Sequence, residues 1–439
     1  MKLVKFRALA WLVTFTGVTT IAQLSIAQLR AQTHYTVTDL GPSGTTFSQA
    51  LAINNYGLAA GVAAGANGAS HAVLWYWGMP TDISRPGLGG PNSIAGAVTD
   101  FGTVVGQAET AALDPNKENF CGFGSNNQCL AFTWDFGTMT ALPTLGGTNA
   151  TFGGANRARQ VVGIAETRNL DTTCPSAPAA NGTGPLLYDF EAVIWGPLPG
   201  QIRELHPLNG DTVGMANANN VWGEVVGASG SCANTTLPGF EAAPHAILWD
   251  TNGTPHSLPS LGGSAPDVTF LGAGNVAFAI NDHDIVAGQA TLSDNRTFHP
   301  VLWQDGVIAD LGVLSGDLVG AALAINKKGD VVGASVSAPG PASGNPRAWV
   351  WHDGILTDLN LIVAGKSPLY LLTAFGINDS DEIVGFGATK DGDLHAFLAT
   401  PCQGSSGSCG SSTTADAMVA PRLSESARET LLHSGLRGR

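Results

Sequence analysis

The chain has 439 residues, of which 57 are Gly and only 12% are charged. Lys and Arg number 20 against 34 Asp and Glu, which gives a formal net charge of −14. So little charge excludes coiled coils, the acidic balance argues against nucleic-acid binding, and 44% hydrophobic residues argue against disorder. A chain rich in Gly, Ala, Val, Thr and Asn predicts many short strands joined by tight turns.

Residues 1–31 have the layout of a secretory signal peptide. An uncharged, largely apolar run from Ala8 to Ala22 is followed by small residues, and we expect cleavage after Ala27 or Ala31. The basic residues that precede the run are Lys2, Lys5 and Arg7. A membrane anchor is the alternative, but the run is shorter than the roughly 20 residues that span a bilayer. We expect a secreted protein, extracellular or periplasmic, without membrane insertion after cleavage.

From residue 33 onward, one three-part unit recurs seven times. The first part is a small-residue run, an Asn/Asp/Gly turn and an apolar run that ends in Gly, as in LAINNYGLAAG (51–61) and FGINDSDEIVG (375–385). The second part is a short apolar strand such as HAVLW (71–75), and the third is a short segment such as TDI (81–83). The first part is typical of a β-hairpin, because Asn, Asp and Gly tolerate the positive φ of tight turns.

The seventh unit is incomplete. After HAFLA (395–399) comes a Ser/Gly tail with no third part, and the missing part is TDL (38–40), which precedes the first hairpin. A closed ring explains this split, because the N-terminal strand then pairs into the last unit. Residues 33–401 allow about 53 residues per unit, enough for four strands. We therefore predict an all-β, seven-bladed β-propeller of four-stranded blades, with a parallel β-helix as the rival.

The alternation of AIN-x-x-G-x-VVG, HAFLW and DLG-x-LGG resembles the HAF repeat, a family of repeat proteins expected to be extracellular. The likeness covers nearly the whole mature chain. It is specific in units one, five, six and seven and degenerate in units three and four. The resemblance implies secretion and a repeat-built β fold, and it implies no reaction.

Two residue types recur at fixed positions of the repeat. The Trp residues are expected to pack between blades, with Ala399 leaving the closing blade less tightly packed; they are Trp75, Trp134, Trp195, Trp249, Trp303 and Trp351. The His residues are expected to form hydrogen bonds at the start of a strand, because they lie on different blades; they are His71, His245, His299 and His395. A metal or catalytic role would need converging partners.

Acidic oxygens cluster in the turns 281–284 and 378–382. Calcium prefers such ligands, but the order does not match the EF-hand spacing, and hairpin turns select Asn and Asp in any case. We expect no cofactor and no metal, with calcium at these turns as the alternative.

Six Cys residues fit an oxidising compartment. Their positions within the repeats predict the pairs Cys121–Cys129, Cys174–Cys232 and Cys402–Cys409. Zinc is the less favoured explanation, because CxxC pairs with nearby His residues are missing from the sequence.

Units two, three and four carry long insertions after their second strand, at 107–129, 164–190 and 228–244. We expect these insertions to rise together over one face and to form a ligand platform. Its candidate binding residues are Asp114, Lys117, Phe120, Phe123, Asp171, Tyr188, Asp189, Phe190 and Phe240. The alternative is that the insertions have no binding role and are cross-linked by disulfides because they would otherwise be flexible.

The sequence lacks the common catalytic motifs, so we expect no catalytic residues. We predict a monomeric binding protein that recognises a protein or a glycan and does not bind nucleic acid. The alternatives are a glycosidase or lyase with carboxylates near the axis and a structural envelope or matrix protein. Residues 402–439 are expected to form a Gly/Ser-rich linker and a flexible tail.

Overall fold

A computed structural model describes residues 33–42, 44–65, 67–174, 186–235, 243–264, 273–337, 345–402, 420–424 and 427. The expected signal peptide lies outside these residues. Within the described part of the chain, none of the helices has the length and apolar character needed to cross a membrane.

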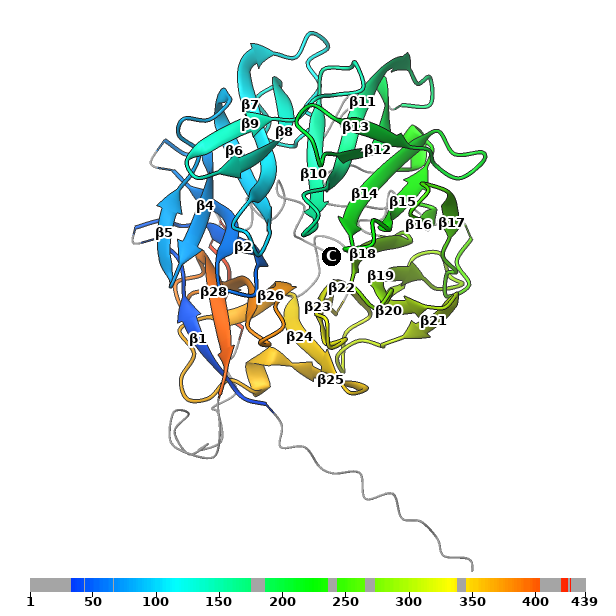
Figure 1. The fold of residues 1–439 in the computed structure, drawn as a ribbon. Helices are drawn as coiled ribbons and strands as arrows, with labels where there is room; N and C mark the ends of the chain where they lie inside the picture. The colour runs from blue at the N-terminus through cyan, green and yellow to red at the C-terminus, as the bar shows by residue number, and fades with distance from the viewer. Residues whose placement is uncertain are drawn as a thin grey trace, which may run out of the picture. The chain divides into compact units, whose positions relative to one another are not determined.

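The described chain forms seven four-stranded antiparallel sheets set around a central axis (Figure 1). Blade one contains β2 (Ser48–Ile53), β3 (Ala59–Ala64), β4 (Ser70–Tyr76) and β5 (Met79–Asp82). Blade two contains β6 (Gly89–Val98), β7 (Val104–Leu113), β8 (Asn127–Asp135) and β9 (Thr138–Ala141). Blade three contains β10 (Ala150–Ala155), β11 (Val161–Leu170), β12 (Tyr188–Trp195) and β13 (Ile202–Leu205). The predicted seven-bladed propeller is confirmed.

The remaining blades repeat this order. Blade four contains β14 (Val213–Asn219), β15 (Val225–Gly230), β16 (His245–Trp249) and β17 (Pro255–Ser257). Blade five contains β18 (Val276–Ile280), β19 (Val286–Thr291), β20 (Phe298–Gln304) and β21 (Val307–Asp310). Blade six contains β22 (Val319–Ile325), β23 (Val331–Val336), β24 (Arg347–His352) and β25 (Ile355–Asp358). Two short 3₁₀ helices, Cys232–Asn234 and Leu359–Leu361, complete the described elements.

Blade seven is shared between the two ends of the described chain. It contains β26 (Tyr370–Ile377), β27 (Ile383–Ala388), β28 (Leu394–Pro401) and, as its outermost strand, β1 (Tyr35–Asp39). β1 runs antiparallel to β28 from Tyr35 opposite Pro401 to Asp39 opposite Phe397. The predicted closure is confirmed, and β1 leaves no open edge on β28.

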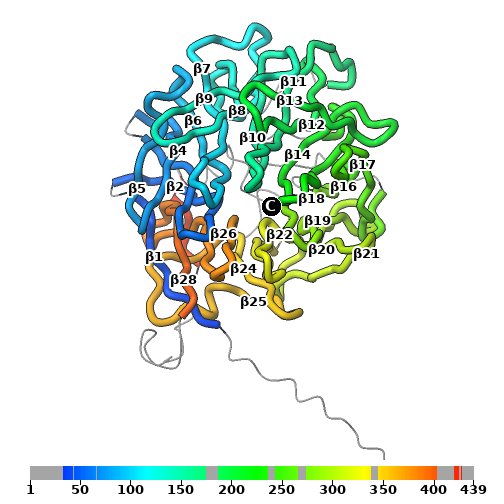
Figure 2. Tube along the Cα trace, viewed as in Figure 1, coloured from blue at the N-terminus to red at the C-terminus, as the bar shows by residue number. Residues whose placement is uncertain are grey.

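The first strand of each blade lies innermost and the last lies at the rim, as the tube in Figure 2 shows for β2 and β5. The inner strands are built from Ala, Gly and other small residues because the blades crowd at the axis. The Gly that ends each apolar run is also required: a Cβ on Gly163 would lie 2.2 Å from the Thr151 carbonyl oxygen and 2.8 Å from Cζ3 of Trp195.

Each blade buries one large aromatic on its third strand, but at two different positions, and in blades two, three, five, six and seven the ring lies against that Gly. In blades one, three, four and five the repeated Trp is fully buried, and its indole N–H donates to a carbonyl that follows the outermost strand of the preceding blade: Trp75, Trp195, Trp249 and Trp303. In blades two, six and seven the buried ring lies two residues earlier: Phe132, Trp349 and Phe397.

Trp134 and Trp351 pack between blades as expected, against clusters formed by two neighbouring blades, but they are only half-buried because Phe132 and Trp349 already fill the space against the Gly. One expectation about packing was wrong. The closing blade is not short of packing at Ala399, since Phe397 is completely buried there.

Asparagine side chains join neighbouring blades at the turn between the first and second strands. In five blades the Asn amide Nδ2 donates to a turn carbonyl of the next blade, at 2.8 to 3.2 Å, from Asn54, Asn156, Asn281, Asn326 and Asn378. The same side chain accepts backbone N–H groups of its own turn; Asn54, for example, accepts from Tyr56 and Leu58. This gives the Asn of the repeated AIN motif a structural role.

Part of the C-terminal region packs against blade seven. Leu423 and Ala427 are buried beside Leu372 and Phe386, and the Ser424 N–H donates to the Gly392 carbonyl at 3.0 Å. The expectation of a wholly flexible tail is thus wrong for this stretch, because two apolar side chains are buried there.

Candidate functional site

The loops between the second and third strands of every blade emerge at one end of the propeller, which we call the loop face. The long insertions of blades two, three and four lie here, between β7 and β8, β11 and β12, and β15 and β16. Residues 175–185 and 236–242, with the candidate Phe240, lie outside the described residues. The candidate site is therefore built from the described parts of the three insertions and from the strands beneath them.

A shared apolar cluster holds the insertions together. Phe120 from blade two and Phe190 from blade three meet edge to face, with ring centroids 6.2 Å apart. Leu186, Met215 and Ala243 belong to the same buried cluster. Phe120 and Phe190 were expected at the recognition surface, but both are buried, because the insertions need a core of their own.

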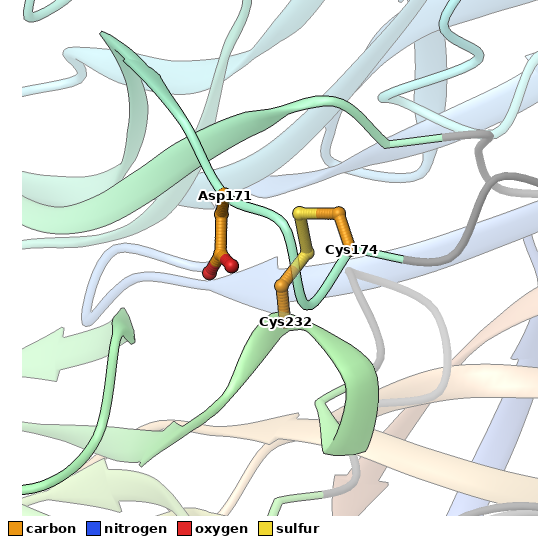
Figure 3. Close-up of side chains that lie close together, drawn as sticks. All are labelled: Asp171, Cys174 and Cys232. Carbon is orange, nitrogen blue, oxygen red and sulfur yellow. A yellow bond between two sulfur atoms is a disulfide. The ribbon is translucent and has the colours of Figure 1, made fainter.

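Two of the three expected disulfides are present. Cys121–Cys129 closes the insertion of blade two, and Cys174–Cys232 joins the insertions of blades three and four. The third expected pair includes Cys409, which lies outside the described residues. Figure 3 shows the Asp171 carboxylate beside the Cys174–Cys232 bond. This group resembles a metal site in composition, but its sulfurs are bonded to each other and therefore are not thiolate ligands.

Buried carboxylates tie the insertion of blade two to blade three. Asp114 accepts from Thr148 Oγ1 at 2.7 Å and from Asn149 Nδ2 at 3.0 Å. Glu118 accepts from the Leu187 N–H at 2.6 Å. Asp114 was expected to face a ligand, but it is buried and takes part in the internal hydrogen bonds that hold the insertion in place.

Glu166 completes this buried group, and sequence reasoning missed it and Glu118. Glu166 Oε2 accepts the Thr148 and Asn149 backbone N–H groups at 3.0 and 2.8 Å. Burial, and then the charge of Glu118, raises the pKa of Glu166 to about 7. Burial and the charge of Asp114 also raise the pKa of Glu118. Since Glu118 and Glu166 have no exposed surface, they cannot contact a polysaccharide as catalytic acids must.

A second acidic group becomes visible when the blades are compared at one repeat position. There, a His or Arg on the third strand pairs with an Asp on the outermost strand in blades one, five, six and seven. The pairs are His71–Asp82 at 2.8 Å, His299–Asp310 at 2.9 Å, Arg347–Asp358 at 3.3 Å and His395–Asp39 at 3.0 Å. In blade four, His245 pairs with Asp211 at 2.8 Å instead. The expected hydrogen-bonding role of these His residues agrees with this geometry.

Blade three reverses the charge at this position. Glu191 replaces the His or Arg, and Glu204 occupies the place of the Asp, in the same register opposite Val193 as Asp82 opposite Val73. Glu191 is only 6% exposed, and its Oε2 has no hydrogen-bond partner. Asp189, two residues earlier on β12, is half-buried, and its buried Oδ1 also lacks a partner. We call Asp189, Glu191 and Glu204 the blade-three acid site.

The electrostatics of this site disfavour the charged forms of Glu191 and Asp189. Burial, followed by the charges of Asp189 and Glu204, raises the pKa of Glu191 to about 9. Burial, with Asp171 and Glu204, raises the pKa of Asp189 to about 6. A cation brought to the site would lower both pKa values, because it would stabilise the charged carboxylates.

The other candidate residues differ in their exposure. Lys117 is exposed, Tyr188 is half-buried, and Phe123 packs its ring partly against the apolar cluster. Asp171 is half-buried and accepts from Thr212 Oγ1 and the Thr173 N–H, both at 2.7 Å. The structure therefore leaves Lys117, Tyr188 and Asp189 most available to a ligand. The missed residues Glu191 and Glu204 carried a sequence signal, since EAVIW replaces HAVLW and REL replaces TDL.

Comparison with known proteins finds only distant similarities among solved structures. No family model and no curated protein matches this chain. The acylaminoacyl peptidase of Pyrococcus horikoshii is 13% identical with a TM-score of 0.47, over 83% of this chain and 54% of the peptidase, so the chain spans about half of that protein's length. The β-propeller domain of the Trilobed protease from Pyrococcus furiosus is 12% identical with a TM-score of 0.44, over 84% and 95%. An oligogalacturonate lyase in complex with manganese is 11% identical with a TM-score of 0.46, over 85% and 95%. Similarities this distant carry no information on activity, substrate or metal.

Proposed function

We propose that this protein is a secreted binding module of the HAF-repeat type that recognises a basic segment of a partner protein through the loop face of blades two to four. The observation that carries the proposal is the charge reversal at Glu191. At this position four other blades place a His or Arg beside an Asp, whereas blade three places a second acid there.

A Lys or Arg side chain of a partner would take the part that His or Arg plays elsewhere in the ring. Glu204 is exposed and pairs with His206 at 3.1 Å, but the buried Glu191 and the half-buried Asp189 are costly to ionise without a cation nearby, so the site gains free energy when one arrives. The stapled insertions support this function, because a rigid site loses little conformational entropy on binding.

The test uses hexa-lysine and hexa-arginine peptides as probes and hexa-glutamate as the negative control, with affinity measured by biolayer interferometry at low and physiological salt. We expect the wild-type protein to bind the basic peptides. We expect Glu191→His to weaken binding by about tenfold or more, because the blade then carries its own cation.

The matched control is Asp391→His, which makes the same charge change at an exposed position on the loop face of blade seven. It should leave affinity within about twofold, since exposed charges contribute little. Equal binding by wild type and Glu191→His, or binding of the acidic peptide, would contradict the proposal. Binding of neutral glycans at the loop face in place of basic peptides would do so too.

Secretion is part of the proposal, and it rests on the N-terminal pattern and the disulfides. N-terminal sequencing of the exported protein should begin at Gln28 or Gln32. A chain that keeps its first 31 residues and stays with the membrane would contradict it.

A further inference from the structure

The end of the propeller opposite the loop face carries exposed aromatic rings that the fold does not require. We call this end the turn face; it holds the turns between first and second strands and those between third and fourth strands. We propose that the turn face of blades one and two binds a neutral polysaccharide chain. The rings are Tyr56 (75% exposed), Trp77 (77%), Phe101 (65%) and Phe136 (95%).

The turns between first and second strands, which we call the inner turns, show that the fold does not require two of these rings. The third turn residue is Tyr56 in blade one and Phe101 in blade two, but other blades hold Ala158, Lys328 and Ser380 at the same place. A position that accepts Ala, Lys and Ser does not need an aromatic ring for folding. Trp222 also lies at this position, but its indole N–H donates to the Asp282 carbonyl at 3.1 Å, so we leave it out of the proposed site.

The turns between third and fourth strands, which we call the outer turns, give an independent argument. In four blades the residue before the Gly of this turn has a backbone conformation in the left-handed region. In blades five and six this residue is Asp305 and Asp353, with φ 52° and 48°. Blades one and two place Trp77 and Phe136 in the same conformation, at φ 50° and 45°. A bulky aromatic residue is disfavoured in this region, whereas Asp and Asn tolerate it. Backbone strain of this kind collects where function demands a particular side chain.

The two inner turns are fixed against each other. Asn54 Nδ2 donates to the Thr99 carbonyl at 2.9 Å. The Asn55 N–H donates to Asp100 Oδ1 at 3.0 Å, and Asn55 Nδ2 donates to Asp100 Oδ2 at 3.2 Å. Tyr56 and Phe101, which follow Asn55 and Asp100 directly, are therefore presented on a rigid frame across the joint between blades one and two.

Charge selects the class of ligand. The four turns that carry the rings contain the acids Asp100 and Asp135 and no basic residue. Arg157 of the next blade is already paired with Asp100. Acidic turns disfavour anionic membranes, nucleic acids and sulfated polysaccharides.

The polar groups around the rings then favour sugar over a protein partner. Asn55, Asp100 and Asp135 lie directly before three of the rings, and Thr103 Oγ1 donates to Asp135 Oδ1 at 2.6 Å, which joins the outer turn of blade two to its inner turn. Sugar rings stack on single aromatic faces, and neighbouring carboxylates and amides accept or donate to their hydroxyls. Four rings over two blades fit a chain of several sugar units.

The experiment measures binding of the full mature protein to cellulose, chitin and cross-linked dextran, with heparin as the anionic comparison. We expect retention on at least one neutral polymer and none on heparin. The double variants Tyr56→Ser/Phe101→Ser and Trp77→Asn/Phe136→Asn copy residues found or tolerated in other blades, and each should weaken binding by about tenfold or more. The thermal midpoint of the second variant should stay the same or rise, because strain is relieved.

The matched control is Ile355→Ala, which removes an exposed apolar side chain that follows the equivalent outer turn of blade six. It should bind like wild type. The proposal is overturned if the wild type binds none of the neutral polymers, if it prefers heparin, or if the aromatic variants bind as well as the control. Since Glu191→His lies on the opposite face, it should not alter polysaccharide binding, so this test and that of the loop face fail or succeed separately.

Discussion

At the residue scale, both proposed sites lie where one or two blades depart from the others. Glu191 shows this most clearly, because four other blades hold His or Arg opposite an Asp at its position. The substitution was readable in the sequence once the units were aligned. Its burial and the missing partner of its Oε2 were not, because they depend on how the insertions fold over β12.

We predict that Glu191→Gln stabilises the protein at neutral and alkaline pH. The pKa of Glu191 is about 9 in the folded protein, against 4.5 for an ordinary Glu. The folded state thus keeps a proton that the unfolded chain releases above pH 4.5, so stability falls as the pH rises from about 4.5 to about 9. A Gln cannot ionise and removes this dependence.

Calorimetric unfolding at about pH 4 and pH 8 measures the effect. Glu191→Gln should match the wild type at the lower pH and exceed it by at least about 1 kcal/mol at the higher pH, since one pKa unit is worth about 1.4 kcal/mol. If Glu191→Gln and the wild type have the same free energy of unfolding at both pH values, ionisation of Glu191 does not destabilise the folded protein.

Sequence reasoning placed Asp114 and Phe190 at a surface, and both are buried. The reason is that an insertion of this length needs hydrogen-bond partners for its backbone groups and an apolar core of its own. Acidic and aromatic residues supply both, and these residue types are also the ones that bind ligands. Only repeat positions, where seven examples can be compared, allow the two uses to be told apart.

At the element scale, the Gly that ends the first part of each repeat decides how closely two strands and an aromatic ring meet. We predict that Gly106→Ala destabilises the protein by about 2 kcal/mol or more. A Cβ there would lie 2.0 Å from the Ile94 carbonyl oxygen and 2.7 Å from Cζ of Phe132. Urea unfolding gives the measurement.

Gly306→Asn is the control for this prediction. Gly306 has φ 76° and open space around it, and Asn tolerates that conformation, so the change should stay within about 0.5 kcal/mol. If both variants lose the same stability, close packing at Gly106 is not the cause.

The disulfide between neighbouring insertions is the second element with a testable role. Removing it with Cys174→Ser/Cys232→Ser should cost about 2–4 kcal/mol, because the bond closes a loop with a sequence separation of 58. Limited proteolysis followed by mass spectrometry should locate new cleavage in the insertions of blades three and four. Cleavage spread evenly over the ring would instead mean that the disulfide holds the blades themselves.

The strands and turns were predictable at this scale, because seven copies of the hairpin pattern reinforce one another. The exchange of Trp134 and Trp351 for Phe132 and Trp349 as the buried ring was not predicted. Two aromatic positions on one strand compete for the same space, and the sequence does not show which of them faces the Gly.

At the scale of the whole molecule, closure of the ring joins the two ends of the propeller. His395 on β28 and Asp39 on β1 lie 3.0 Å apart, and the hydrogen bond with Asp39 raises the pKa of His395. A raised His pKa means that this contribution to stability is present below pH 6.5 and is lost as the pH rises through the folded-state pKa.

We therefore predict that Asp39→Asn costs more stability at about pH 6 than at about pH 9, by up to about 1 kcal/mol for a partly exposed pair. Chemical unfolding of wild type and variant at the two pH values tests this. A loss that is the same at both would assign the role of Asp39 to neutral hydrogen bonding.

Closure could be predicted from the sequence because the third part of the seventh unit was missing at one end and present at the other. The sequence did not predict a candidate site on the turn face, because the exposure of its aromatic rings depends on which turns the blades bring together. These rings are Tyr56, Trp77, Phe101 and Phe136. Both proposed sites nevertheless require the ring to be closed, because each is held in place by contacts between neighbouring blades.

Closure is tested most directly by a cross-link between β1 and β28. Thr36 lies opposite Thr400 in the register of these strands, at positions where antiparallel neighbours come close enough for a disulfide. In the Thr36→Cys/Thr400→Cys variant, purified under oxidising conditions, peptide mapping should find an intramolecular disulfide between the two new cysteines, with the native pairs kept and the protein monomeric. If the new cysteines remain free, or link only between molecules, the two ends do not meet and the closed seven-bladed ring is wrong.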